Sequence, residues 1–114
     1  MVTENDVRRV ALSLPQTTEK PSYGTPGFRA KNKLFARLRE DGALVVWCED
    51  EGEKLALISS EPDTFFTTSH YDGYPMVLVR LEAIELDELT ELLTESWRLR
   101  APAKLVVAFD EKHE

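Results

Sequence analysis

Hydrophobic residues recur along this chain at helical spacing in three stretches. Residues 3–14 carry apolar side chains three or four positions apart, Thr3 is placed to cap the first turn, and Pro15 stops the pattern. Residues 50–62 show a shorter version of the same pattern. Residues 86–100 show the most regular one, with acids in the first turns and arginines in the last. Three helices are therefore predicted.

Strand patterns occupy the middle of the chain. Residues 28–49 predict three strands joined by two-residue turns at Lys31-Asn32 and Asp41-Gly42, since Asp-Gly is a frequent hairpin dipeptide. The apolar run 75–81 predicts a buried strand. Two further segments are less defined. The proline- and glycine-rich residues 15–27 suit an irregular or edge segment, and residues 103–109 fit a helix or a strand equally well.

The order of these elements predicts an α+β fold. It is α-β-β-β-α-β-α with a short C-terminal element, which suggests an antiparallel meander packed by the first and late helices within one domain spanning residues 1–114. The expected core residues are Leu34, Leu38, Trp47, Val77, Val79, Leu89, Leu93 and Trp97.

Two-residue turns would fix which side chains share a face of the sheet. One face would be an apolar core, formed by Leu34, Ala36, Leu38, Val45 and Trp47. The opposite face would mix aromatic and basic side chains, with Phe28 and Phe35 beside Arg37 and Arg39. The alternative is that the two phenylalanines pack under a helix or loop and the basic side chains are merely solvated.

The charge of the chain is unevenly distributed. The net charge is −7, yet residues 20–39 contain six basic residues and no acid. A mixed basic and aromatic face suits a negatively charged partner, such as single-stranded nucleic acid, an acidic protein segment or a small anion. Because the remainder of the chain is acidic, we expect nucleic-acid binding to be weak.

Catalytic and metal-binding motifs are not found. There is no phosphate-binding glycine loop, paired-cysteine motif or nucleophile elbow, so we expect a protein that is not an enzyme and uses no cofactor. Cys48 and His70 would form a nucleophile and base only if the fold joined them. Glu88, Glu91 and Glu95 share a helix side, which we interpret as a solvent face and not a metal site.

His70 lies in the stretch "SHYDGYPMV", residues 69–77, which combines turn residues with two tyrosines. We expect a structural corner that leads into the strand, with His70 fixed by hydrogen bonds. A small-molecule site or active site built on His70 and Tyr74 is the alternative.

Neither a bilayer-spanning run nor an N-terminal apolar signal is present, and Cys48 is the single cysteine. These features predict a cytoplasmic protein without membrane contact. They leave the oligomeric state open.

Four segments, in order, carry a resemblance to a known family: "LSLPQTTE", "PGFRAKNKLFARL", "SHYDGYPMVLVRL" and "ELTELLTESWRLRAPAKL". Together they resemble the MmcQ/YjbR family of small bacterial proteins. Tyr74 stands where that family usually has tryptophan, and Trp97 where it has tyrosine. The matching positions are Phe28, Arg29, Lys33, Phe35, His70, Gly73, Tyr74 and Ser96.

The resemblance implies a CyaY-like α/β sandwich and, from the family's label, DNA binding by a double-wing arrangement of hairpins. We therefore expect a binding module that engages an anionic partner through the basic and aromatic face. The residues expected to form or border its site are Phe28, Arg29, Lys31, Lys33, Phe35, Arg37, Arg39, His70 and Tyr74.

Overall fold

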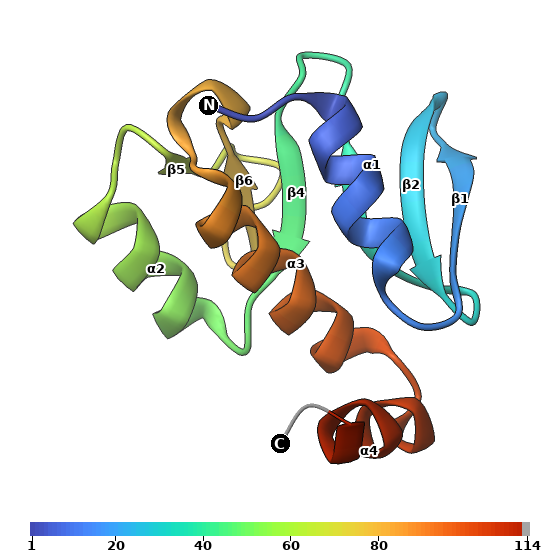
Figure 1. Ribbon diagram of the computed structural model, residues 1–114. Coiled ribbons are helices and arrows are strands. Elements are labelled where there is room, and N and C mark those ends of the chain that lie inside the picture. The colour runs from blue at the N-terminus through green and yellow to red at the C-terminus, as the bar shows by residue number, and fades with distance from the viewer. Residues whose placement is uncertain (113–114) are drawn as a thin grey trace.

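A six-stranded antiparallel sheet forms one layer of the molecule, and helices form the other (Figure 1). The computed structural model describes residues 1–112. Its strands are β1 (Thr17–Ser22), β2 (Thr25–Ala30), β3 (Lys33–Leu38), β4 (Leu44–Trp47), β5 (Phe65–Phe66) and β6 (Met76–Val79), in the spatial order β1-β2-β3-β4-β6-β5. Its helices are α1 (Glu4–Ser13), α2 (Glu51–Ser60), α3 (Leu86–Arg100) and α4 (Ala103–Lys112), with a 3₁₀ turn at Leu81–Ala83. The predicted α+β class is confirmed.

Helix α1 starts at the predicted cap. The Thr3 hydroxyl accepts from the Asp6 amide, and the Asp6 carboxylate accepts from the Thr3 amide, which completes a capping box. Helix α3 follows its predicted pattern, because Leu89, Leu93 and Trp97 are fully buried. The open question at residues 103–109 resolves as helix α4.

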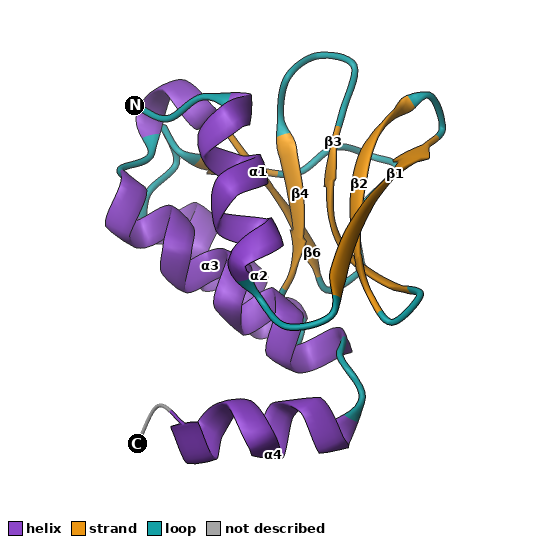
Figure 2. Ribbon diagram, turned by 45° about the vertical axis from the view of Figure 1, so that its right-hand side comes forward, coloured by secondary structure: helices purple, strands orange, loops and turns teal. Residues whose placement is uncertain are grey.

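The helices cover only one face of the sheet. Figure 2 shows α1, α2 and α3 on the same side of the strands, with α4 extending below them. The main core lies between these layers. The opposite face carries a smaller apolar cluster of Ala43, Val45, Tyr71 and Leu78 and has no helix over it, so we call it the open face. Within residues 1–112, no helix is both long and apolar enough to cross a membrane.

The first predicted hairpin turn is confirmed and the second is wrong. Lys31 and Asn32 both adopt positive φ between β2 and β3. The second loop has three residues, 40–42: the Arg39 amide donates to the Ala43 carbonyl at 2.8 Å, and Gly42 takes a φ of +88°. Such a loop ends in a left-handed residue that favours glycine. The added residue pairs Arg37 with Val45 instead of Val46.

Strand β3 also contains a bulge, which the turn argument did not anticipate. Phe28 pairs with Ala36 and Arg29 with Leu34, so Phe35 has no partner across from it. Phe35 and Ala36 are both fully buried. A bulge therefore lets two consecutive side chains of β3 enter the core.

These two irregularities change the predicted faces, although Ala36 and Leu38 lie in the core as predicted. The helix-covered face of the hairpins carries Phe28, Phe35, Ala36, Leu38, Leu44 and Val46. Val45 lies on the open face, and Leu34 and Trp47 are half-buried instead of forming the core. Leu34 instead lies over Gly27, where a Cβ would approach the Leu34 Cδ1 atom to 3.1 Å.

Candidate functional site

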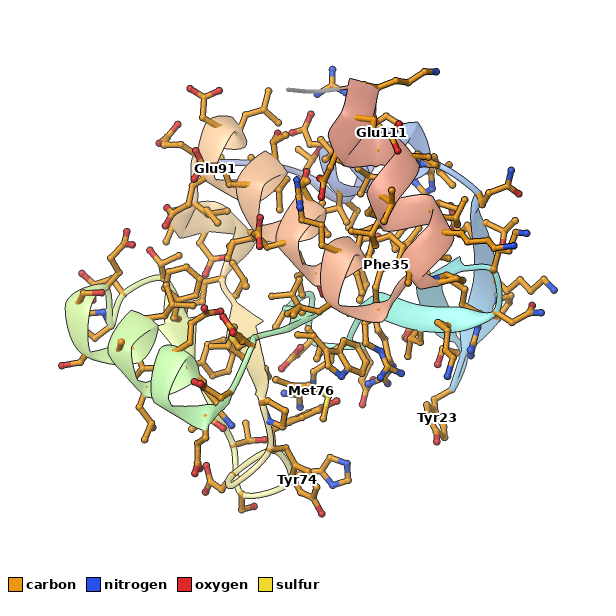
Figure 3. The ribbon with its side chains drawn as sticks, turned by 90° about the horizontal axis from the view of Figure 1, so that it is seen from below. Tyr23, Phe35, Tyr74, Met76, Glu91 and Glu111 are labelled. Atoms are coloured by element: carbon orange, nitrogen blue, oxygen red, sulfur yellow. The ribbon has the colours of Figure 1, made fainter. Side chains whose placement is uncertain are left out.

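The open face bears a cavity of about 460 Å³ at the end of β3. Three separate segments form it: the β1–β2 turn, the β3–β4 hairpin and the loop before β6. Figure 3 shows Tyr23 and Tyr74 projecting from the side of the molecule away from α3 and α4. The residues that line the cavity are Tyr23, Arg37, Arg39, Glu40, His70 and Tyr71. We call it the arginine pocket.

Arg37 is held in place by three neighbours. Its Nη1 atom donates to the Tyr71 hydroxyl at 3.2 Å, and its Nε atom donates to the Ser22 carbonyl at 3.4 Å. Its guanidinium carbon lies 5.2 Å from the centre of the Tyr23 ring, within the range of a cation–π contact. The guanidinium is thus pre-positioned at the pocket wall.

Arg39 brings a hydrogen-bond donor that has no partner. Its Nη1 atom is buried and makes no hydrogen bond among the described residues. Its Nη2 atom lies 3.6 Å from an Asp41 carboxylate oxygen. A buried N–H group without an acceptor is costly, so this donor would gain from an added anion.

The acids near the two arginines neutralise them only weakly. Glu40 lies 3.6 Å from Arg37 and its side chain is 74% exposed, while the Asp41 side chain is 50% exposed. Such solvent-exposed ion pairs contribute little energy. An anion entering the pocket could therefore displace these carboxylates.

The loop that supplies His70 and Tyr71 is fixed from beneath by a buried lysine. Lys54 of α2 is 1% exposed, and its ammonium donates to the Tyr71 carbonyl at 2.5 Å and to the Tyr74 carbonyl at 3.0 Å. Gly73 closes the loop with a φ of +84°. The His70 ring lies edge-on to Tyr71 with 5.0 Å between ring centres.

The predicted site residues separate into three groups. Arg37, Arg39 and His70 meet in the pocket. Phe28 and Phe35 are fully buried beneath the helices, so the prediction that their rings share an exposed face with the arginines is wrong, because the bulge in β3 turns Phe35 to the side opposite Arg37. The remaining predicted residues lie outside the pocket lining: Arg29, Lys31 and Lys33 around the β2–β3 turn, and Tyr74, which is 57% exposed.

Sequence reasoning missed four residues of this region. Tyr23, Glu40 and Tyr71 complete the pocket lining, and all three belong to glycine-containing loop segments that the sequence does mark as turns. No pattern in the sequence marks Lys54 as buried, because a single lysine within an acidic helix is typical of a solvated charge.

Cys48 and His70 do not come together as a nucleophile and base. Cys48 lines a different cavity, between α2 and α3, whereas His70 lines the arginine pocket. Burial, followed by the nearby Glu53 carboxylate, raises the pKa of the Cys48 thiol to about 11. The thiol is therefore protonated at neutral pH.

Known proteins are similar to this chain in sequence or in fold. The uncharacterized proteins Rv2570 of Mycobacterium tuberculosis (strain H37Rv) and Mb2600 of Mycobacterium bovis are each 42% identical over 127 aligned positions, which cover 96% of this chain and 96% of theirs. The crystal structure of Deinococcus radiodurans protein DR2400, with the family-model domain DUF419, superposes with a TM-score of 0.73 at 24% identity, covering 87% of this chain and 78% of that one. The family model YjbR matches residues 12–99. The chain belongs to the YjbR family.

Proposed function

We propose that this protein is a binding module for a small anionic ligand, held in the arginine pocket. The observation that carries the proposal is the buried Arg39 Nη1 donor, which has no acceptor within residues 1–112 and lies beside a second, pre-positioned guanidinium. Phosphate and carboxylate groups accept paired hydrogen bonds from the N–H groups of arginine. Binding without turnover is the simplest role for such a pocket.

The surrounding side chains suit an anion that carries a flat or polar body. Tyr23 is 91% exposed and His70 is exposed, so both can contact a ligand without rearrangement of the core. The Tyr71 hydroxyl accepts from Arg37 and donates to no described residue, so its own proton can be donated to the ligand. The pocket volume of about 460 Å³ falls in the range of small-molecule sites.

Thermal unfolding in the presence of phosphate, pyrophosphate and citrate tests this proposal, because a ligand that binds only the folded state raises the Tm. We expect a saturable rise that Arg39→Gln abolishes. Lys33→Gln, which removes an exposed charge outside the pocket, should retain it. Equal effects of the anions on both variants would reduce the proposal to general salt stabilisation.

Single-stranded nucleic acid is a second candidate, favoured by the exposed Tyr23 ring beside Arg37. A base could stack on Tyr23 while its phosphate meets the arginines. This is the form in which we retain the DNA-binding role implied by the family resemblance. Fluorescence anisotropy at low salt should detect weak binding that Arg37→Glu/Arg39→Glu removes, with a salt slope of about −0.7 per phosphate contacted. If no nucleic acid bound at low salt, the small anion would be the remaining candidate ligand.

We also propose a cytoplasmic location. The chain has one cysteine, and Cys48 is a buried free thiol, which is the usual state in a reducing compartment.

A further inference from the structure

Tyr23 occupies a turn position that disfavours it. Together with Gly24 it forms the two-residue turn between β1 and β2, closed by the Ser22–Thr25 pair, with φ values of +55° and +81°. Asn-Gly is a usual sequence for such a turn, and a bulky side chain in the left-handed region is strained. Other non-glycine residues within 1–112 share a positive φ, but none of them lines the arginine pocket.

The Tyr23 side chain also adds little to the stability of the fold. It is 91% exposed, so it buries little apolar area. Its ring lies 5.2 Å from the Arg37 guanidinium, a contact that contributes little energy at an exposed position. Figure 3 shows the side chain projecting away from the ribbon. A strained and exposed aromatic residue at the wall of a pocket is typical of a ligand contact, because strain of this kind gathers at functional sites.

The pocket offers a ligand three kinds of contact. Arg37 and Arg39 supply N–H donors, and Tyr23 supplies a flat aromatic surface. Glu40 lies 3.6 Å from Arg37 and is largely exposed, so an anion that replaced it there would leave its carboxylate to accept from ligand hydroxyls. The complementary molecule therefore has an anionic end, hydroxyl groups and a flat ring.

The two guanidinium groups favour a terminal phosphate as the anionic end. A phosphate monoester carries a charge of about −1.5 to −2 at pH 7 and three acceptor oxygens, whereas a phosphodiester carries a single charge. Arg39 Nη1 has no acceptor among the described residues, and Arg37 has only a weakly paired, exposed carboxylate beside it. One phosphate monoester can accept from both arginines.

We propose that the arginine pocket binds a nucleoside monophosphate. The phosphate accepts from Arg37 and Arg39, the sugar hydroxyls donate to Glu40, and the base stacks on Tyr23. This inference rests on the proposed function, because it names the class of the small anion. Every base has a flat π-face, so Tyr23 selects for the presence of a base and not for its identity.

Isothermal titration calorimetry with AMP, ribose 5-phosphate and inorganic phosphate tests the contribution of the base. AMP should bind at least about tenfold more tightly than ribose 5-phosphate, because the two differ only by the base that stacks. The dinucleoside phosphate ApA has two bases but only an internal phosphodiester. It should bind at least about tenfold more weakly than AMP.

Two substitutions at Tyr23 separate the ring from the turn. Tyr23→Asn removes the ring and introduces a residue that suits the left-handed turn, so the variant should fold with an equal or higher Tm. It should lower the affinity for AMP about tenfold. Inorganic phosphate should stay within about twofold, since Ser22 and Tyr71 still hold Arg37. Tyr23→Phe keeps the ring and should retain AMP within about threefold.

The outcomes distinguish this inference from the proposed function. If phosphate bound but AMP bound no more tightly than ribose 5-phosphate, or if Tyr23→Asn left the AMP affinity unchanged, recognition of a base would be refuted and the anion pocket would stand. ApA binding as tightly as AMP would replace the monophosphate by a nucleic-acid chain. If none of the three anions bound, or if Arg39→Gln left their binding unchanged, the anion pocket itself would be refuted.

Discussion

The Ser96 hydroxyl donates a hydrogen bond of 2.5 Å to the Phe35 carbonyl, 61 residues away in the sequence. The same hydroxyl accepts from the Trp47 amide at 2.8 Å. One side chain of α3 thus joins β3 to β4 just beyond the last pair of their ladder, Ala36 and Val46. The β3–β4 pairing stops at Ala36 and Val46, and the buried serine satisfies the two backbone groups that follow.

Ser96→Ala should destabilise the protein by about 2 to 4 kcal/mol, because it leaves two buried backbone groups without a hydrogen bond. Urea unfolding measures the change. Thr90→Ala on the exposed side of the same helix is the control, and should change the free energy of unfolding by no more than about 0.5 kcal/mol. Equal losses for the two variants would show that the serine bridge has no special role.

Lys54→Met should loosen the loop that carries His70 and Tyr71. The variant keeps most of the side-chain volume but removes an ammonium from two carbonyls, at an expected cost of about 2 to 5 kcal/mol. Hydrogen exchange should accelerate at the amides of Tyr71, Asp72 and Tyr74, which bond within the loop.

Lys104→Met, at an exposed position, is the control for Lys54→Met and should leave both stability and loop exchange unchanged. If Lys54→Met left the exchange of these loop amides as it is in the wild type, the lysine would not be what holds the loop.

Cys48 should make the stability depend on pH above 9. The folded-state pKa is raised by burial to about 11 from an ordinary value of 9.0, so the unfolded chain loses the thiol proton first. The resulting stabilisation is complete below pH 9 and is lost as the pH rises towards 11, by about 2 to 3 kcal/mol for two pKa units. Cys48→Ala should lack this part of the pH dependence. Parallel curves for the two proteins between pH 8.5 and about 10.5 would refute the shift.

Local patterns predicted most of the fold, because each long element carries its own periodicity and caps. Helix α3 and the hairpin strands follow from such signals. Which side chains share a face of the hairpins could not be predicted from local patterns. One added loop residue at Gly42 and one bulged residue at Phe35 each reverse the alternation of side chains along a strand. Neither irregularity has a distinct local signal: Asp-Gly occurs in both two- and three-residue loops.

The candidate site was predictable only in part. Arg37, Arg39 and His70 were selected by residue type, and the fold brings them together. The role of Lys54 depends on which carbonyls of a distant loop lie above α2, and that is a property of the tertiary structure alone.

The most direct test of the arginine pocket is an NMR titration that follows the arginine Nε–H signals during addition of pyrophosphate. We predict saturable shifts for Arg37 and Arg39, accompanied by the His70 ring signals, while Arg9 and Arg29, which lie outside the pocket, remain in place. Arginine signals that do not move, or that all move together in proportion to ionic strength, would contradict the central claim that this pocket binds an anion.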